Sequence, residues 1–405
     1  MKFARIALAI TLTIIVLSSL GCTGQTPPQG FTGVTTDGNT LYVGTNQGKL
    51  LALDPAARAA QEPFPSRGEW SQAITKESRG MFGCGTSQVA SVLYGDPVLT
   101  DGHLCIGTYD GKVLMMNRES RAAGIMFPQL RDGEWLYPRT DKSIGPVVGT
   151  VAVAGDAVFV SSSIKEGSQT RGVVYAIDRN YGDELWVSEL LDGKLWVTPA
   201  VVDGVVYVST FEGHIYSLNA ATGKLLPWVY NSEFGFVSSP FVADGMVYVA
   251  SFDRRLSAIP IGADAPAWQF QADNWFWARP LLVNGRLFAP SLDGNVYAFD
   301  PKTGASLWGT PYSAGEALAT PPVAVGESIV VITKMGDVHI VNQATGMGAR
   351  VPNPTNEKAT TLSAAVNADP CYLDGLLYVR AQNNVLYAVD PVQRSVVYSF
   401  SLKTE

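Results

Sequence analysis

Eight copies of one short pattern run through the chain of 405 residues, and this repetition limits the fold more than any other feature. A copy has two or three apolar residues, a first turn of the Asp-Gly type, an apolar and aromatic segment, a second turn, and a segment that ends in Asp or Asn. The complete unit then adds a Thr-Gly turn and a segment that reaches a Trp. The first-turn glycines are Gly38, Gly102, Gly155, Gly204, Gly245, Gly285, Gly326 and Gly375.

The second turn lies nine or ten residues after the first in every copy except the third, where residues 164–171 are inserted. Gly and Asn tolerate the positive φ that tight hairpins need, which gives a steric reason for their recurrence at this position. The segments between the turns are rich in Val, Tyr, Phe and Ile, which predicts β-strands. The second-turn residues are Gly48, Gly111, Gly172, Gly213, Gly294 and Gly336, with Asn384 in the last copy and Arg254 as the exception.

Each copy therefore predicts a blade of four antiparallel strands, which cannot bury both its faces alone. Closing the blades into a ring gives each blade two neighbours and leaves few exposed edges. We predict that residues 30–405 form an all-β fold, an eight-bladed β-propeller of four-stranded antiparallel blades, with about 48 residues per copy. The last copy supplies its own outer strand, so we expect blade eight to pack on blade one without sharing a strand.

Copy six, "LDGNVYAFDPKTGASLW" (292–308), shows the expected role of each repeated residue. Gly294 makes the hairpin, Asp300 and Gly304 shape the turn, and Trp308 docks the outer strand. Residues that recur once per blade at the same place are expected to be structural, since Asp caps turn N–H groups and Trp is buried between blades. The recurring Trp residues are Trp70, Trp135, Trp186, Trp228, Trp268 and Trp308.

The N-terminus has the charge layout of an export signal. Lys2 and Arg5 precede an uncharged run, Ile6 to Leu20, that is short for a membrane span. The run is followed by Gly21-Cys22 and resembles a bacterial lipoprotein signal, which implies removal of residues 1–21 and lipid attachment at Cys22. The alternative is ordinary secretion with Cys22 as a free thiol. Residues 22–29 are predicted to be a Pro-rich linker, and the protein is expected on the extracytoplasmic face of a bacterial membrane or in the periplasm.

The net charge limits the kinds of partner to expect, and the cysteine content limits the possible disulfides. Without residues 1–21 the chain has 27 basic and 36 acidic residues, a net charge of −9, and no basic run, so nucleic acid is not an expected partner. If Cys22 carries lipid, an odd number of cysteines remains: Cys84, Cys105 and Cys371. A Cys84–Cys105 disulfide and buried free thiols are both open interpretations.

At copy six the chain resembles the pyrroloquinoline quinone (PQQ) repeat of quinoprotein alcohol dehydrogenases and of the propeller lipoprotein that assists outer-membrane barrel assembly. The resemblance implies a cofactor site of the kind found in the enzymes, where PQQ lies between a Trp and a disulfide of two adjacent cysteines, beside a Ca²⁺ ion. This chain has no adjacent cysteines and no dense cluster of Ca²⁺ ligands. His103, His214 and His339 fall in different blades, so no metal site and no cofactor are expected.

The connections between blades are unusually aromatic. Clustered exposed rings favour a site for a partner or ligand. Six copies also have a Pro five residues before the first-turn Gly, and Trp196 and Trp277 each lie three residues before such a Pro (Pro199 and Pro280), a shared position that also fits a role in packing. In a β-segment successive side chains point to opposite faces, so the three rings of 275–277 cannot all enter one core. The candidate binding surface is Trp135, Tyr137, Trp196, Phe234, Phe236, Trp275, Phe276 and Trp277.

These observations favour a non-catalytic, membrane-anchored scaffold that binds a protein partner in the bacterial cell envelope. The resemblance to the barrel-assembly lipoprotein implies a role in envelope protein assembly. Two alternatives remain open: a PQQ-dependent quinoprotein dehydrogenase that uses PQQ and calcium, and a carbohydrate-binding propeller whose aromatic loops hold a glycan or another small molecule.

Overall fold

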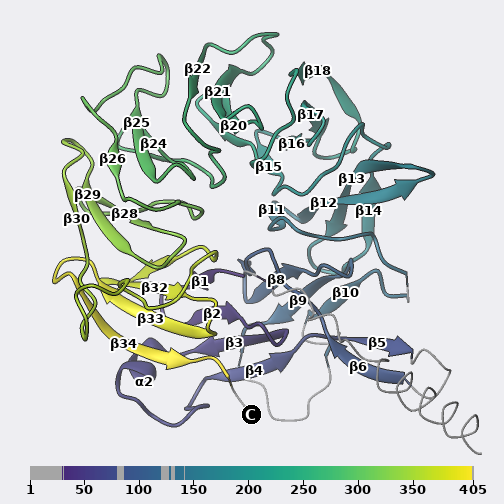
Figure 1. Ribbon diagram of the computed structural model, residues 1–405. Helices are drawn as coiled ribbons and strands as arrows, with labels where there is room; N and C mark the ends of the chain where they lie inside the picture. Colours follow the sequence, from purple (N-terminus) through teal and green to yellow (C-terminus); the bar gives the residue numbers. More distant parts are fainter. Residues whose placement is uncertain are drawn as a thin grey trace, which may run out of the picture.

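The computed structural model describes residues 30, 32–79, 86–119, 127–128, 133–140 and 142–403. The predicted signal peptide, Cys22, the linker up to residue 29, and Cys84 lie outside these residues. Eight four-stranded antiparallel sheets stand around a ring in chain order, from purple to yellow in Figure 1. The predicted eight-bladed β-propeller is therefore confirmed. Within the described residues, the helices fall short of the length and apolar character that a membrane span requires.

Blades one to four occupy the first half of the ring. Helix α2 (Pro55–Ala59) follows β3, and a separate hairpin of β5 (Thr75–Arg79) and β6 (Thr86–Ala90) joins blade one to blade two. The blade strands are β1 (Val34–Thr36), β2 (Leu41–Gly44), β3 (Lys49–Leu53), β4 (Trp70–Ala73); β7 (Val98–Leu99), β8 (His103–Gly107), β9 (Val113–Asn117), β10 (Trp135–Tyr137); β11 (Ala152–Ala154), β12 (Ala157–Glu166), β13 (Gln169–Asp178), β14 (Glu184–Val187); and β15 (Ala200–Val202), β16 (Val205–Ser209), β17 (His214–Asn219), β18 (Leu225–Asn231).

Blades five to eight complete the ring with the same strand order. Their strands are β19 (Phe241–Ala243), β20 (Met246–Ala250), β21 (Arg255–Pro260), β22 (Trp268–Gln271); β23 (Leu281–Val283), β24 (Arg286–Pro290), β25 (Asn295–Phe299), β26 (Tyr312–Ser313); β27 (Val323–Val325), β28 (Ser328–Ile332), β29 (Val338–Asn342), β30 (Gly348–Arg350); and β31 (Cys371–Leu373), β32 (Leu376–Arg380), β33 (Val385–Asp390), β34 (Ser395–Ser401).

The turns follow the predicted pattern with one correction. All eight first-turn glycines have positive φ, between 56° and 97°, and Arg254 (φ 70°) and Asn384 (φ 62°) adopt the same conformation. The prediction that Gly172 makes the second turn of blade three is wrong. The turn is at Gly167 (φ 60°), and Gly172 pairs with Ser163 inside the ladder. The inserted residues lengthen both β12 and β13 instead of forming a loop, which moves the turn outward.

The hydrophobic core is divided among the junctions between blades. Each of eight clusters of buried residues draws its members from two neighbouring blades, including blades eight and one. Between blades five and six, for example, Tyr248 and Trp268 pack with Leu287 and Phe299. A single blade therefore buries little alone, and stability depends on the complete ring.

One aromatic side chain near the outer strand of a blade also bonds to the next blade. The indole Nε1 of Trp268 donates to Pro301 O at 2.9 Å, and that of Trp308 donates to Gln343 O at 3.1 Å. The acceptor is a carbonyl in the turn after the third strand of the following blade, and we call this bond the blade lock. It recurs from Trp70 to Arg118, Trp135 to Arg179, Trp186 to Ala220, Trp228 to Ala263, and Tyr398 Oη to Pro55.

The turn that receives each lock is shaped by its own residues. In blade six, Asp300 Oδ1 accepts from the backbone N–H groups of Lys302 and Thr303 at 3.0 and 2.8 Å. Gly304 (φ 71°) lies against the indole of Trp268, where an added Cβ would come within 2.6 Å of the ring. Asp300 and Gly304 therefore form the receiving surface for the Trp of the preceding blade.

The ring closes without a shared strand, as the sequence predicted, because β1–β4 and β31–β34 form separate sheets. Arg380 crosses the junction of blades eight and one. Its Nη1 donates to Gly30 O and Thr32 O, both at 3.2 Å, and its Nη2 donates to Asn46 Oδ1. Asn46 N in turn donates to Asn384 Oδ1 at 3.2 Å. A buried guanidinium thus replaces the covalent continuity that the other junctions have.

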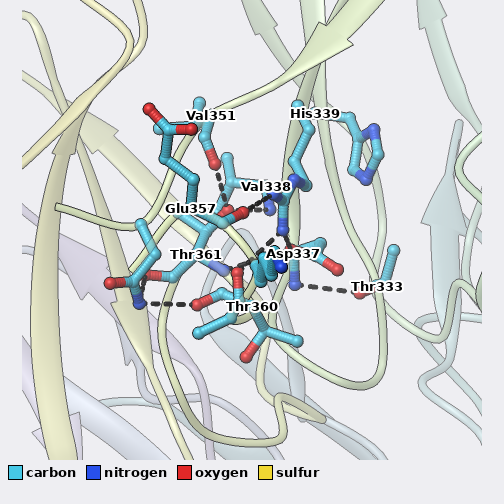
Figure 2. A network of polar contacts seen from close by, with 12 residues as sticks. Thr333, Asp337, Val338, His339, Val351, Glu357, Thr360 and Thr361 are labelled. Carbon is cyan, nitrogen blue, oxygen red and sulfur yellow. Dashed lines mark hydrogen bonds and ion pairs between the residues drawn. The ribbon is translucent and has the colours of Figure 1, made fainter. Parts of the chain in front are cut away.

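Blade seven has no Trp at the lock position. Ala349 pairs with Ile340 where Trp268 pairs with Ala258 in blade five. The long connection after β30 folds back onto this blade instead, as Figure 2 shows. Arg350 Nη1 donates to Asp337 Oδ1 at 3.0 Å and to Ala359 O at 2.8 Å, and Thr361 N donates to Asp337 Oδ1 at 3.1 Å.

Replacing Trp268 by Ala is expected to lower the free energy of unfolding by about 3–5 kcal/mol, because a buried ring and one donor to Pro301 O are lost. Trp277 is the control. Its side chain is 48% exposed, so Trp277→Ala is expected to change that free energy by no more than about 0.5 kcal/mol. Urea unfolding followed by circular dichroism measures both variants, and equal losses would contradict the structural role of the lock.

Candidate functional site

One face of the ring gathers the connections between blades and the turns between second and third strands. Phe211 N donates to Lys194 O at 3.2 Å, and Phe252 N donates to Gly235 O at 2.8 Å. Leu292 N donates to Trp275 O at 2.8 Å in the next blade. Each bond joins the connection that enters a blade to that blade's second turn. We call this side of the ring the turn face.

Four aromatic rings form a continuous row across the turn face of blades four to six. Trp196 meets Phe211 with centroids 5.7 Å apart, Phe211 meets Phe252 at 5.5 Å, and Phe252 meets Trp275 at 5.6 Å. All three contacts are edge-to-face, which is a favourable geometry for aromatic pairs. Trp275 Nε1 also donates to Phe252 O at 2.9 Å. We call Trp196, Phe211, Phe252 and Trp275 the aromatic row.

The chain at Gly235 threads between two members of the row. A Cβ at Gly235 would lie 1.7 Å from Phe211 O and 3.1 Å from the Phe252 ring, so no larger residue fits. Phe234 precedes it and is 44% exposed, and Phe252 is 38% exposed. The row and Phe234 therefore present apolar surface to solvent while the backbone beneath them is fixed.

A single ammonium group lies on one end of the row. Lys194 Nζ is 3.0 Å from the centroid of the Trp196 ring and 5.5 Å from that of Phe211. Burial lowers the pKa of Lys194, and the neighbouring Glu212 opposes that shift. A cation over an indole face is a favourable electrostatic contact, so Lys194 helps to hold Trp196 in place.

Carboxylates surround the row. Asp192, Glu212, Glu233 and Asp273 are all exposed on the same connections and turns. Arg254 is an exposed cation in this region, and its Nη1 donates to Asp273 O at 3.3 Å. The site is thus an apolar strip with a largely acidic border, an arrangement typical of protein interfaces with an apolar centre and a polar rim.

Four residues of the predicted binding surface are buried, so their assignment to an exposed surface is wrong. Trp135 is 1% exposed because it forms a blade lock. Tyr137 is 8% exposed, and its hydroxyl donates to Glu184 Oε2 at 2.5 Å. Phe236 and Phe276 are each 1% exposed and belong to junction cores. These four side chains stabilise the propeller and cannot contact a partner.

The other four predicted residues reach the surface. Trp196 and Trp275 are half-buried members of the row, and Phe234 and Trp277 are exposed. Residues 275–277 alternate as a β-segment requires, with Phe276 pointing inward between two more accessible indoles. The structure therefore brings Trp196, Phe234 and Trp275 together on the turn face.

Sequence reasoning missed Phe211 and Phe252, the two central rings of the row. Both follow the Ser or Thr that opens the second turn, in "TFEG" (210–213) and "SFDR" (251–254). The equivalent residue is Tyr109 in blade two and Leu292 in blade six. An apolar residue in a tight turn was the available signal, because turns ordinarily favour polar residues.

No described residues form a group of three or more His, Cys, Asp or Glu side chains suited to a metal ion. The three histidines are each engaged locally: His103 Nδ1 lies 3.0 Å from Asp101 O, His214 Nδ1 lies 2.7 Å from Asn231 Oδ1, and His339 Nδ1 lies 2.8 Å from Tyr312 Oη. Cys105 is a buried free thiol whose pKa is raised by burial.

The repeats, the meander blades and the blade locks define a β-propeller of the PQQ-like-repeat class. The family described as "Outer membrane protein assembly factor BamB" matches residues 170–346 and 263–398, which together cover more than half of the chain. The chain belongs to this family.

Three relatives bear the same description. The chain is 23% identical to the protein from Yersinia pestis over 309 residues, which are 76% of this chain and 70% of that protein. It is 28% identical to the protein from Moranella endobia over 176 residues and 25% identical to that from Shewanella oneidensis over 192 residues. These two alignments span only 43% and 47% of the relatives' own lengths, and 40% and 44% of this chain.

Two solved structures share the fold. The crystal structure of BamB from Moraxella catarrhalis matches with a TM-score of 0.59 and 18% identity, covering 92% of this chain and 95% of that one. The computationally designed Ika8 protein also matches with a TM-score of 0.59, at 15% identity, covering 76% of this chain and 87% of that one. Similarity at this level of identity concerns the architecture.

Proposed function

We propose that the protein is a non-catalytic, lipid-anchored scaffold of the bacterial cell envelope, and that it serves the assembly of envelope proteins by docking a partner protein on its turn face. The aromatic row is the observation that carries this proposal. Membership of a family described as an outer membrane assembly factor supports the particular role. The printed names of the relatives from Yersinia, Moranella and Shewanella agree with it.

The row has the physical properties of an anchor for protein binding. Large aromatic side chains bury much area and lose little conformational entropy, which makes them frequent hot spots. The edge-to-face contacts and the Trp275–Phe252 hydrogen bond fix the rings before a partner arrives. Preorganisation of this kind lowers the entropic cost of association. The acidic border would favour a partner with basic residues around an apolar centre.

The test is capture of envelope proteins from the organism that carries this chain. Phe252→Ala and Trp275→Ala together are expected to weaken retention of the partner by at least about 30-fold, the loss of one hot spot of about 2 kcal/mol. Met347→Ala is the matched control, because Met347 is 77% exposed but lies in the turn between β29 and β30. Quantitative mass spectrometry of crosslinked eluates measures retention.

Equal capture by the row variant and the wild type would contradict docking on the row. Retention on a glycan array that Trp275→Ala abolishes, without any retained protein, would instead support the carbohydrate-binding alternative. Circular dichroism of both variants checks that each is folded before capture.

The proposed anchor is tested separately. Cys22→Ala is expected to move the protein from the membrane fraction to the soluble fraction, because the chain would lose its lipid attachment site. Immunoblots of fractionated cells measure the change, with Cys371→Ala as the control for loss of a thiol. Membrane partitioning that Cys22→Ala leaves unchanged would contradict lipidation.

We propose further that the propeller takes no PQQ and has no dehydrogenase activity. The supporting observation is that the chain lacks the adjacent cysteines and dense carboxylate cluster that the quinoprotein resemblance would require. After incubation with PQQ and Ca²⁺ and exhaustive dialysis, the expected absorbance spectrum is that of the protein alone. Stoichiometric quinone uptake, with reduction of an artificial electron acceptor, would support the enzyme alternative.

A further inference from the structure

A series of hydrogen bonds relates the start of blade one to the connections that lead into the next blades. Gly33 N donates to Asp96 Oδ1 at 2.5 Å, and Asp96 N donates to Thr150 Oγ1 at 3.0 Å. Thr150 N donates to Thr198 Oγ1 at 3.0 Å. These four residues therefore hold the same position in blades one to four, each just before an innermost strand. Gly30, three residues before Gly33, lies in the stretch that leads into blade one.

The matching stretch of blade four shows on which side of the ring this entry lies. Leu195 takes the place there that Gly30 has in blade one. The residue before it, Lys194, accepts a hydrogen bond from Phe211 N of the second turn at 3.2 Å. In blade one, Gly30 lines a small cavity together with Asn46 of the second turn. The chain therefore enters blade one on the turn face.

Buried hydrogen bonds fix this entry. Arg380 Nη1 donates to Gly30 O and to Thr32 O, both at 3.2 Å. In the connection to blade four, the hydroxyl of Ser163 does the same for Leu195 O at 3.1 Å. Arg380 is 3% exposed and Thr32 is 1% exposed. Because unmaking buried hydrogen bonds is costly, the place at which the chain leaves the ring stays the same.

The sequence limits how far Cys22 can lie from this place. Residues 22 and 30 are eight peptide steps apart, and a chain spans at most about 3.5 Å per step, so in any conformation the tether reaches no more than about 28 Å. One strand separates the turn face from the opposite face, which is about 17 Å for the five residues of β16.

A path from the entry to the opposite face uses nearly the whole reach of the tether. Around the rim, the four strands of a blade add up to about 14 Å to the length of one strand. Through the axis, the tether would first have to return past Gly33. Little or none of the tether would then remain to meet a membrane on that side.

We propose that the tether holds the turn face, and with it the aromatic row, toward the membrane, so that the partner docks on the membrane-facing side of the propeller. This inference rests on the proposed lipid anchor at Cys22. It deepens the proposed function, because it assigns the partner to the space between the propeller and the membrane.

The border of the row favours a protein over lipid as the occupant of this space. Asp192, Glu212, Glu233 and Asp273 are exposed around the row, and anionic lipids repel such a border. Indoles alone are common at membrane interfaces, but here the carboxylates oppose burial of the rings in the bilayer. The turn face is thus directed toward the membrane without entering it.

Two exposed methionines of blade seven provide matched positions for a test. Met335 is 52% exposed in the second turn, on the turn face, and Met347 is 77% exposed in the turn between β29 and β30, on the opposite face. Met335→Cys and Met347→Cys, each combined with Cys84→Ala and Cys371→Ala, are labelled with a fluorescent donor. The full lipidated chain is reconstituted in phosphatidylcholine vesicles that contain a headgroup-labelled acceptor lipid. Energy transfer is expected to be more efficient from position 335 than from position 347.

A lengthened tether is the control for the cause of this difference. Inserting about 40 Gly and Ser residues between Cys22 and Gly30 adds a root-mean-square length of about 35 Å, which lets either face approach the bilayer. The difference between positions 335 and 347 is expected to shrink in this variant. Circular dichroism checks that every labelled protein is folded.

The possible failures can be told apart. Membrane-bound protein with equal transfer from both positions, or with more efficient transfer from position 347, would overturn the orientation and leave the anchor intact. A wild-type chain that does not associate with the vesicles would refute the anchor, and the inference with it. Quenching of indole fluorescence by brominated acyl chains that Trp275→Ala abolishes would show the row inserted in lipid, which would overturn docking of a protein there.

Discussion

The hydrogen bond from a buried Trp to the turn of the next blade is the interaction on which the structure depends. Each blade has only four short strands and cannot bury its faces alone, so the lock and the junction core behind it decide the spacing of neighbouring blades at seven of the eight junctions. Where the lock is missing, between blades seven and eight, the Arg350–Asp337 pair and the folded-back connection hold blade seven instead. Blades eight and one are not joined by a chain connection, and there Arg380 of blade eight donates a hydrogen bond to Gly30 O.

The residues proposed to dock a partner lie where the copies of the repeat differ. The repeated positions are occupied by turn glycines, capping carboxylates and lock tryptophans, all of which serve the ring. The second turns of blades four and five depart from this pattern with Phe211 and Phe252, and the connections around them add Trp196 and Trp275. Because the locks fix the blades, rings from separate blades stay in edge-to-face contact. The fold thus brings residues that are far apart in the sequence together in one apolar strip.

The repeat made the blade count, the turn glycines and the lock positions predictable, because each has a local steric cause visible at fixed spacing. It could not tell which aromatic residues of a connection face inward: Phe236 and Phe276 are buried beside accessible Phe234 and Trp275. The insertion in blade three looked like a loop but extends a hairpin to Gly167.

Hydrogen–deuterium exchange of the protein with and without its captured partner tests the central claim most directly. If the aromatic row docks the partner, exchange should slow across residues 192–196, 233–236, 252–254 and 273–277, all on the turn face. The turns that receive the blade locks, such as 220–223 and 301–304, should exchange as in the free protein. Protection confined to those lock turns, with none across the aromatic row, would contradict this account.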